Sequence, residues 1–597
     1  MRTIASVGFS IVGSGTLSTR TSRFPCQVTA FIDVLSSQGQ PPARRQKSRC
    51  PNSGRLVVAA NIVGAMQTVR EAAFDLFRSA GMTTIFGNPG STELPMLAEF
   101  PEDFDYVLGL QEAAVVGMAD GYAQATGRPT LVNLHTAPGV GNAMGAIFNA
   151  QANHSPLVIT AGQQVRAQMT LQANLTNRDA AILPQPLVKW SYEPPRAEDV
   201  PLALGRAAHL AALPPRGPVF VSVPMDDWTA EVDESYAGHT IGRSVDGRTG
   251  AAPALVEELA GRLAAARNPA MVAGPDVDAG GGWEAAVALA ERQRLAVFAS
   301  PAPGGGRIGF PENHSHFQGI LPPAIGPLAE ALDGYDLVLV AGSSAFPYYP
   351  YIEGPLLPEG TSLVMVTSDP DEAARAPLGD AIVADVRLTL EALLAACPES
   401  DRKPPAQRPD PEPAPESDPA SPAAVFDSLA GVLPEDGIIV LESPSSTLAL
   451  RNRIRISRPG SYFFGAGGGL GFGLAAAVGV QLAEPQRPVV CVVGEGSAQY
   501  AITALWSAVA HSVPLTVLVL RNDEYAILKW FAQMEGVEGA PGLDLPALES
   551  AEIADAYGLS ASRVDDPAEV GNALAAAISS PQPELIEVRV AAGMAMG

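Results

Sequence analysis

Glu495 stands between two glycines directly after an apolar run, in the stretch VVCVVGEGSAQY. The following apolar run, PLTVLVLRND, reaches Asn522, with Glu524 just beyond it. If both runs are parallel strands joined by one helix, their carboxyl ends lie side by side at one edge of a sheet. Carboxylate and amide oxygens are ligands that suit Mg²⁺. The spacing therefore predicts a metal site made by Glu495, Asn522 and Glu524.

Phosphate-binding groups surround this predicted metal site. A helix is expected to begin near Ser497, and the free N–H groups and the dipole of a helix start favour an anion. Another strand end, in VLESPSST, offers Ser445 and Ser446 as hydroxyl donors. The predicted diphosphate-binding residues are Ser445, Ser446, Gly496, Ser497 and Tyr525.

The elements that must position these residues form a repeated α/β pattern. Short apolar runs such as TLVNLH, PAMVAG, YDLVLVAG and GIIVLES alternate with amphipathic segments, which is typical of parallel sheets covered by helices. We expect three doubly wound domains, at 66–230, 251–396 and 423–592. A polar linker over 229–250 and a Pro-rich linker over 398–422 separate them.

The first 65 residues differ from the rest, because they are basic, rich in serine and almost free of acids. Such a start can be a transit peptide, whereas the run IASVGFSIVG is a poor signal-peptide core with no convincing cleavage site after it. We interpret residues 1–65 as a disordered extension or the product of an upstream start codon. The folded chain is expected to begin near Met66.

The composition narrows the class of protein. A length of 597 residues with 47% hydrophobic residues predicts several globular domains, and no apolar run reaches the roughly 18–20 residues that span a membrane. A net charge of −25 argues against nucleic acid or an anionic membrane as a partner. The four cysteines show no metal-binding spacing, so we expect a cytoplasmic protein.

The motif GEGS…RNDEY resembles the binding motif of thiamine diphosphate enzymes, in which Gly-Asp-Gly precedes an Asn. Other stretches extend the resemblance over nearly all of 66–592: FGNPGSTELP, LQEAAVVGMADGYAQATGRP, HSPLVITAGQQ and GLGFGLAAAVGVQLAEP. The pattern is similar to the thiamine diphosphate-dependent 2-oxo acid decarboxylases, most closely the benzoylformate decarboxylase group. This resemblance implies pyrimidine-binding, middle and diphosphate-binding domains, with thiamine diphosphate and Mg²⁺ as cofactors.

The resemblance also implies the catalytic residues. Glu112, in GLQEAAVVGMA, would hydrogen-bond the aminopyrimidine ring, and an acid in an apolar helix start can stay protonated. His135 and His314 would act as proton donors or acceptors, and Ser91 would contact the substrate carboxylate.

Each of these residues also has a structural interpretation. Glu112 could complement a helix dipole, and Ser91 could cap a helix with Glu93 nearby. His314 could be misaligned with His316, and the HSH pair could hold a metal, although no third ligand is visible.

The resemblance assigns pocket residues as well. Leu528 and Phe531 would form walls around an aromatic ring, Leu470 would support the bent cofactor, and Gly468 would bind it in the same GGGLGFG loop. The implied reaction is the non-oxidative decarboxylation of an aromatic 2-oxo acid such as benzoylformate. The family assembles as homodimers or homotetramers with the cofactor between subunits.

The sequence departs from the family at the metal motif, where Glu495 replaces the usual Asp. The extra methylene moves the carboxylate by about 1.5 Å, and Mg²⁺ tolerates little distortion. Arg521 and Asp523 also replace the usual neighbours of Asn522, and Asp523 could compensate. Two alternatives therefore stay open: another thiamine diphosphate lyase or carboligase, like acetolactate synthase or benzaldehyde lyase, and a non-catalytic relative.

Overall fold

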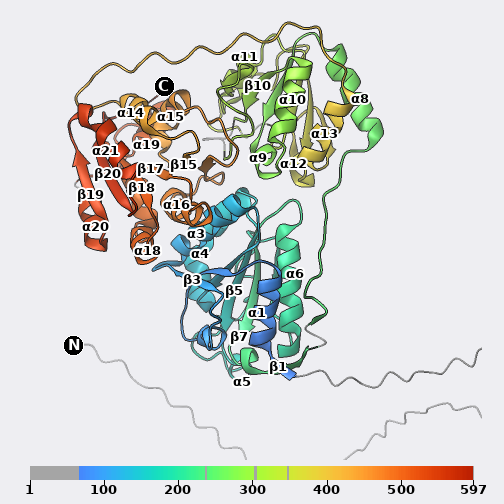
Figure 1. The fold of residues 1–597 in the computed structure, drawn as a ribbon, viewed down its shortest axis with the longest axis vertical. Coiled ribbons are helices and arrows are strands. Elements are labelled where there is room, and N and C mark those ends of the chain that lie inside the picture. Colours follow the sequence, from blue (N-terminus) through green and yellow to red (C-terminus); the bar gives the residue numbers. More distant parts are fainter. Residues whose placement is uncertain (1–65, 235–237, 302–305, 346–347, 547, 596–597) are drawn as a thin grey trace, which may run out of the picture. The chain divides into compact units, whose positions relative to one another are not determined.

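Three parallel six-stranded sheets organise the chain (Figure 1). The structure is a computed structural model that describes residues 66–234, 238–301, 306–345, 348–546 and 548–595. The extension predicted at residues 1–65 lies outside the described residues. Helices connect the successive strands, so the predicted α/β class with three doubly wound sheets is confirmed.

The first sheet has the strand order β3-β2-β4-β5-β7-β6. Its strands are β2 (Thr84–Asn88), β3 (Asp105–Leu108), β4 (Thr130–Leu134), β5 (Leu157–Gln163), β6 (Trp190–Tyr192) and β7 (Val219–Pro224). Its helices are α1 (Val69–Ser79), α2 (Leu94–Leu97), α3 (Glu112–Thr126), α4 (Thr136–Ala152), α5 (Arg166–Met169) and α6 (Val200–Ala212). β1 (Met66–Thr68) pairs antiparallel with β8 (Glu231–Asp233), which places a strand inside the segment predicted as a linker over 229–250.

The middle sheet has a different order, β11-β10-β9-β12-β13-β14. Its strands are β9 (Pro269–Ala273), β10 (Ala296–Ala299), β11 (Phe317–Ile320), β12 (Leu337–Ala341), β13 (Ser362–Thr367) and β14 (Asp380–Val383). Its helices are α8 (Pro253–Ala265), α9 (Pro275–Ala279), α10 (Trp283–Gln293), α11 (Ile325–Ala331), α12 (Pro370–Arg375) and α13 (Val386–Ala396).

The third sheet has the order β16-β15-β17-β18-β20-β19. Its strands are β15 (Ile438–Glu442), β16 (Tyr462–Phe464), β17 (Val489–Gly494), β18 (Leu515–Arg521), β19 (Ser560–Val564) and β20 (Glu584–Arg589). The helices with which it is associated are α14 (Pro422–Val432), α15 (Thr447–Arg453), α16 (Phe472–Ala483), α17 (Glu495–Ala498), α18 (Ala504–Ala510), α19 (Ala526–Met534), α20 (Ser550–Tyr557) and α21 (Val570–Ile578).

The Pro-rich segment between α13 and α14 has neither helix nor named strand, but it is held by side chains. The Arg402 guanidinium donates to the Gln293 carbonyl at 2.8 Å, and Arg408 donates to Asn452 at 2.6 Å. This segment therefore follows the surface of the domains it connects, with defined contacts.

Glycines bring α3 of the first sheet against α16 of the third. A side chain on Gly121 would lie 2.2 Å from the Ala476 carbonyl oxygen, and one on Gly479 would lie 1.8 Å from that of Met118. Only glycine permits such a close approach of two helix backbones. The buried side chains of α3 and α16 share one hydrophobic core, so the helix that begins with Glu112 has a fixed position.

No helix among the described residues is long and apolar enough to cross a membrane.

Candidate active site

Glu112 is the first residue of α3 and is only 8% exposed. Asn142 of α4 donates its side-chain amide to Glu112 Oε2 at 3.0 Å. A side chain on Gly139 would lie 3.4 Å from both Glu112 and His135, so these two residues flank the same turn of α4. The Glu112 carboxyl group is therefore buried, and it forms no ion pair with a basic side chain among the residues that the structure describes.

His135 follows β4 and is held by a buried carboxylate. Its Nδ1 lies 2.8 Å from Glu93 Oε2, and Glu93 is 1% exposed. The same carboxylate accepts hydrogen bonds from the backbone N–H groups of Gly90, Thr136 and Gly162, at 2.8, 3.2 and 2.8 Å. With Nδ1 facing a carboxylate, Nε2 is the ring nitrogen left for other chemistry. We call Glu93, Glu112 and His135 the first-sheet cluster.

Packing against His135 explains why Gly90 stands in the turn FGNPGSTE. A side chain on Gly90 would lie 2.1 Å from His135 Nδ1, so only glycine lets this turn pass over the imidazole. The next residue, Ser91, is exposed. Ser91 therefore lies next to the turn that passes over His135, and its contact with a substrate stays a prediction.

Glu93 was predicted only as a helix-capping neighbour of Ser91. Its role in the first-sheet cluster was missed. Glu93 does bond the Gly90 N–H, as a capping residue would, and the neighbouring Thr92 hydroxyl, but its other partners are His135 after β4, Thr136 of α4 and Gly162 of β5. Those contacts depend on tertiary packing. An acid just after the Gly-Asn-Pro-Gly turn, two residues from a predicted site serine, was the available signal.

A cavity of about 160 Å³ lies at the carboxyl ends of β15, β17 and β18. We call it the third-sheet cavity. The predicted residues that line it are Ser445, Ser446, Leu470, Glu495, Gly496, Ser497, Asn522, Glu524, Tyr525 and Leu528. The structure therefore brings the predicted metal and diphosphate residues together. Gly468 and Phe531 are not among the residues that line it.

Glu495 is 2% exposed and begins α17. Its Oε1 accepts the backbone N–H of Asn522 at 3.0 Å, so the two residues face each other across β17 and β18. Burial raises the pKa of Glu495, and backbone hydrogen bonds oppose this shift. The longer side chain is accommodated by this bond to the neighbouring strand end.

The other acidic residues near Asn522 have partners of their own. Glu524 forms an ion pair with Lys529, and its Oε1 accepts the Gly593 N–H at 2.7 Å. Arg521 pairs with Asp523 at 2.9 Å and with Glu587 at 3.2 Å. Neither Arg521 nor Asp523 lines the cavity, so a compensating role for Asp523 has no support from these contacts.

The loop that carries Leu470 is fixed by two residues that the sequence analysis missed. Glu442 accepts the N–H groups of Gly471, Phe472 and Gly473, at 2.7, 3.3 and 2.9 Å. Asn149 of α4 binds the backbone N–H and carbonyl of Gly469, at 3.0 and 2.8 Å. Burial raises the pKa of Glu442 to about 8, and the three N–H donors oppose this shift.

The predicted aromatic wall contacts the middle domain. Phe531 of α19 packs against Tyr349, with ring centroids 5.1 Å apart. Leu528 is 45% exposed and Tyr349 is 61% exposed, so this wall is open on one side in the single chain. Tyr349 was not predicted, because nothing in its local sequence connects it with α19.

His314 lies elsewhere in the middle domain. Its Nε2 is 3.3 Å from Glu291 of α10, and its ring packs edge-on against Phe310 and His316. It does not line the third-sheet cavity, and its catalytic role stays a prediction. Among the described residues, neither His314 nor His316 belongs to a group of three or more side chains that could hold a metal ion.

The comparisons with known proteins agree with this arrangement. Residues 67–181 match the N-terminal TPP binding domain of thiamine pyrophosphate enzymes, residues 256–393 the central domain and residues 445–588 the C-terminal TPP binding domain. The chain belongs to the thiamine pyrophosphate enzyme family.

Individual relatives narrow the class. The chain is 51% identical to "Benzoylformate decarboxylase" of Pseudomonas aeruginosa, over 88% of this chain and 99% of that protein. An acetolactate synthase large subunit from Haemophilus influenzae is 25% identical, over 85% of this chain and 92% of that protein. The resemblance to thiamine diphosphate-dependent decarboxylases predicted from the motifs is therefore confirmed.

Two solved structures share the fold. The Rhodococcus jostii thiamine diphosphate-dependent 4-hydroxybenzoylformate decarboxylase has a TM-score of 0.86 and 45% identity, covering 89% of this chain and all of that one. The benzoylformate decarboxylase of Polynucleobacter necessarius has a TM-score of 0.85 and 40% identity, covering 89% and 99%. The chain is a carboxy-lyase of the thiamine diphosphate type, similar to the benzoylformate decarboxylases.

The third-sheet cavity fits the diphosphate end of this cofactor. Hydroxyls of Ser445, Ser446 and Ser497 supply donors for phosphate oxygens, and Glu495 with Asn522 supplies oxygens for a divalent cation. A side chain on Gly496 would lie 2.6 Å from Tyr525 and 2.8 Å from Leu545, so only glycine lets these side chains pack against the loop that follows β17.

Proposed function

We propose that this protein converts benzoylformate to benzaldehyde and carbon dioxide, with thiamine diphosphate and Mg²⁺. The observation that carries the proposal is the 51% identity to the benzoylformate decarboxylase of P. aeruginosa over 99% of that protein. The buried first-sheet cluster and the third-sheet cavity provide the acid–base and anion-binding groups that this reaction needs.

Thiamine diphosphate, when bound, supplies the electron sink that accepts the electron pair left by the departing carbon dioxide. Ser445, Ser446 and Ser497 would donate to its phosphates, and Leu470 would support its rings. Glu495 and Asn522 would hold the Mg²⁺. We propose no direct metal bond for Glu524, because Lys529 and the Gly593 N–H already engage it.

Glu112 would donate its proton to the aminopyrimidine ring of the cofactor. The side chain is 8% exposed, and the Asn142 amide donates to its Oε2 at 3.0 Å. His135 would deliver a proton from Nε2 to the product carbon, while Glu93 holds Nδ1. A well-placed acid–base group contributes about 10²–10⁴-fold to the rate.

The substrate groups have matching partners. Ser91, exposed beside the His135 turn, would bind the carboxylate, and Leu528 with Phe531 and Tyr349 would enclose the aromatic ring. Tyr349 adds a hydroxyl at this wall, and the R. jostii relative is named for a hydroxylated substrate. His314 is retained as the second proposed proton-transfer residue, as the resemblance implies, although it does not line the third-sheet cavity.

A substrate panel tests the proposal. Purified protein with thiamine diphosphate and Mg²⁺ is incubated with benzoylformate, 4-hydroxybenzoylformate or pyruvate, and carbon dioxide and aldehyde are quantified. We expect benzoylformate to give kcat/KM at least about tenfold above pyruvate. Acetolactate formed from pyruvate, or a coupled ketol as the main product of benzaldehyde, would instead support the carboligase alternative.

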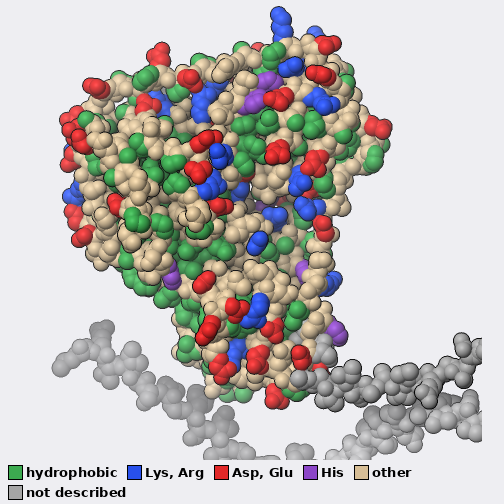
Figure 2. Space-filling model, in the orientation of Figure 1, with side chains coloured by type: hydrophobic (Ala, Val, Ile, Leu, Met, Phe, Trp, Pro, Cys, Tyr) green, Lys and Arg blue, Asp and Glu red, His purple; other side chains and the backbone are tan. Residues whose placement is uncertain are grey.

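We also propose that the active site forms between two copies of the chain. The third-sheet cavity has no lining residue from the first sheet, so Glu112 and His135 of the same chain do not complete it. Large apolar side chains are exposed near both halves: Leu94, Leu110, Phe148, Tyr500 and Leu528. Figure 2 shows hydrophobic side chains at the surface where α4 and α16 lie. Such exposed apolar surface is typical of an interface.

Mixing two inactive variants tests this interface. Glu112→Gln and Glu495→Ala chains, each inactive alone, are denatured together and refolded or coexpressed. A shared site predicts recovery of about a quarter of the wild-type activity, because half of the dimers are hybrids and each has one intact site. Mixtures that stay inactive, although hybrids form by native mass spectrometry, would show that each chain carries its own complete site.

A further inference from the structure

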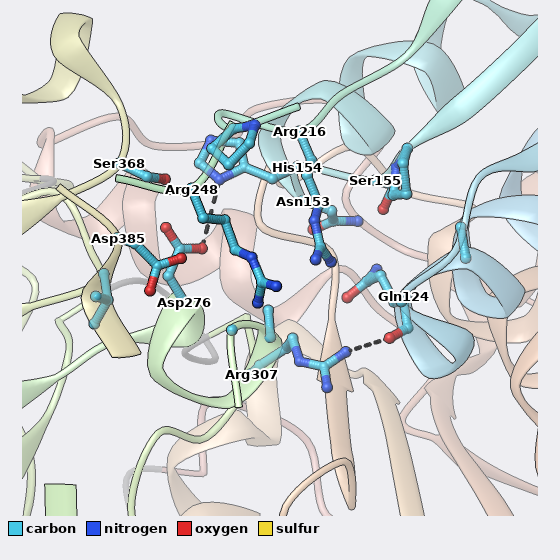
Figure 3. Close-up of a pocket in the computed structure, with 17 residues that line it drawn as sticks. Gln124, Asn153, His154, Ser155, Arg216, Arg248, Asp276, Arg307, Ser368 and Asp385 are labelled. Carbon is cyan, nitrogen blue, oxygen red and sulfur yellow. Dashed lines mark hydrogen bonds and ion pairs between the residues drawn. The ribbon is translucent and has the colours of Figure 1, made fainter. Parts of the chain in front are cut away.

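A second group of potential ligands lies outside the active site, where the first sheet meets the middle sheet. His154 follows α4, and its ring lies between Asp276 of α9 and Asp369 before α12. The Nδ1 atom is 3.5 Å from Asp276, and Nε2 is 3.9 Å from Asp369. Figure 3 shows His154 and Asp276 from the side of an adjoining pocket. One potential donor atom each from His154, Asp369 and Glu372 lies within 4.8 Å of the others.

The distances distinguish two kinds of contact. A separation of 3.9 Å between Nε2 and a carboxylate oxygen is too long for a hydrogen bond. Two donors that each lie about 2.1 Å from one ion are at most about 4.2 Å apart. The gap beside Nε2 therefore has the size that a shared ion would fill.

Each ligand is oriented by a second contact. Asp369 Oδ1 accepts the Asp371 N–H at 2.8 Å, which leaves Oδ2 directed toward His154. Glu372 Oε2 accepts the Thr367 hydroxyl at 2.8 Å. Asp276 faces the opposite ring nitrogen of His154. A carboxylate on the far nitrogen of a ligating histidine is the usual outer contact of a metal site.

The adjoining cavity contains polar groups that lack partners. It has a volume of about 430 Å³ and is lined by His154, Asp369, Glu372, Ser300 and Ser343, among others. Ser300 is 2% exposed, and its hydroxyl has no hydrogen-bond partner among the described residues. The Ser343 hydroxyl is likewise buried without one. Buried hydroxyls are normally paired, so a water or another ligand in this cavity would satisfy both.

Charge favours a cation over an anion at this position. Asp276, Asp369, Asp371 and Glu372 line the cavity together with Arg307 and Arg375. Arg307 is already bound to Asp278 at 2.9 Å, and Arg375 approaches Glu372 only at 3.4 Å. Arg216 and Arg248 belong to the adjoining pocket of Figure 3 and do not line this cavity.

We propose that His154, Asp369 and Glu372 bind a divalent transition-metal ion of the Zn²⁺ class, which joins the first sheet's α4–β5 connection to the middle domain. One imidazole nitrogen with two carboxylate oxygens suits such ions, whereas Mg²⁺ and Ca²⁺ prefer oxygen ligands alone. Ser300 and Ser343 would then hydrogen-bond a water or anion in the open coordination position. This site is separate from the residues that handle the cofactor.

The test is a metal titration of the tag-free holoenzyme, saturated with thiamine diphosphate and Mg²⁺ so that the cofactor site is filled. Binding of Zn²⁺ is measured by isothermal titration calorimetry with ZnCl₂. Co²⁺ then replaces Zn²⁺ as a spectroscopic probe of how the bound ion is coordinated. We expect one Zn²⁺ per chain at this site and a higher Tm when it is bound. Decarboxylase activity should stay unchanged.

Matched variants identify the ligands. His154 has a left-handed backbone with a φ of 54°, so His154→Asn is chosen because Asn tolerates this conformation. His154→Asn and Glu372→Gln should each weaken Zn²⁺ binding by about 100-fold or more. Asp371→Asn removes a neighbouring charge that is not a proposed ligand, and it should bind as wild type does.

The alternative without a metal ion is that His154 is only a positively charged partner of the surrounding acidic side chains. In that case Zn²⁺ binds wild type and His154→Asn equally or neither, and the proposal is overturned. Circular dichroism checks that each variant folds. If His154→Asn does not fold, Glu372→Gln alone decides, and unchanged Zn²⁺ binding by this variant would also overturn the proposal.

Discussion

The first and third sheets have the same topology but carry different chemistry. Their orders, β3-β2-β4-β5-β7-β6 and β16-β15-β17-β18-β20-β19, are the same when strands are counted within each sheet. At the carboxyl ends, the first sheet presents Glu112 and a histidine held by Glu93, whereas the third presents serines and the Glu495–Asn522 pair. The fold thus provides an edge for ligands, and the side chains decide whether it handles protons or phosphates.

The two sheets also differ in how their acids are held. Glu93 bonds three backbone N–H groups and a histidine, so both of its oxygens are occupied within the chain. Glu495 lines an open cavity, with one oxygen bonded to the Asn522 N–H. A position whose acid is fully engaged by its own chain should tolerate less change than one whose acid faces a ligand.

Glu112→Gln should have the largest effect on the first-sheet half. The amide cannot donate the carboxyl proton, so kcat for benzoylformate should fall about 10²–10⁴-fold. Binding of thiamine diphosphate, followed by calorimetry, should weaken much less. Glu102→Gln, at an exposed position on the same domain, is the control and should retain wild-type activity. Wild-type kcat in Glu112→Gln would remove this residue from the mechanism.

Glu93→Gln should have the next largest effect. The amide can accept only through one oxygen, so it loses part of the contact with His135 and the backbone donors. Because Glu93 acts through His135, kcat should fall about 10–10²-fold while KM for benzoylformate changes little. Glu93→Asp, which keeps the charge, should recover part of the loss.

Glu99→Gln serves as the control for Glu93, because Glu99 is largely exposed and pairs with Arg70. A rise in KM without a fall in kcat for Glu93→Gln would mean that the turn around Ser91 has moved, and that His135 is not positioned through this carboxylate.

Glu495→Asp tests the third-sheet half of the site. Unlike the two variants above, it should cause a small gain, in cofactor binding. Restoring the shorter side chain should keep or improve Mg²⁺-dependent thiamine diphosphate binding, by up to about tenfold, because Mg²⁺ favours a close octahedral set. Cofactor titration at fixed Mg²⁺ measures this change. Weaker binding in Glu495→Asp would mean that the bond from Glu495 to the Asn522 N–H is itself part of the site.

Much of this architecture was predictable from buried runs of sequence. Strands such as β4, β17 and β18 are fully or almost fully buried, so their uninterrupted apolar runs identified them and placed Glu495 and Asn522 at strand ends. Edge strands such as β14 and β19 are mostly exposed, with one buried residue each, so their sequences lack such an apolar run.

The residues that were missed are those defined by distant packing. The roles of Glu93, Asn149 and Glu442 arise from contacts with other elements. Tyr349 meets Phe531 across two domains, a contact that no local pattern encodes. The resemblance implied a proton-transfer role for His314, which lies beside Glu291 of α10, and that role stays a prediction.

Glu442→Gln should have the smallest effect on activity, but a defined effect on stability. Burial raises the pKa of Glu442 from 4.5 to about 8, so the folded chain keeps a proton that the unfolded chain releases. Between about pH 4.5 and pH 8 the folded state binds more protons, so the contribution of this group to the free energy of unfolding falls as pH rises. Gln does not titrate and should lack this component.

The measurement is the Tm of wild type and Glu442→Gln at pH 5.5, 6.5 and 7.5. Gln offers one acceptor oxygen to the N–H groups of Gly471, Phe472 and Gly473, so the variant should have the lower Tm at pH 5.5. The gap should then narrow by about 1–2 °C per pH unit. Glu435→Gln, whose side chain is 72% exposed, should track wild type at every pH. A Tm difference that widens with pH would mean that Glu442 is ionised in the folded protein, with its charge held by the three N–H groups. The third-sheet loop would then depend on a carboxylate, as the first-sheet cluster depends on Glu93.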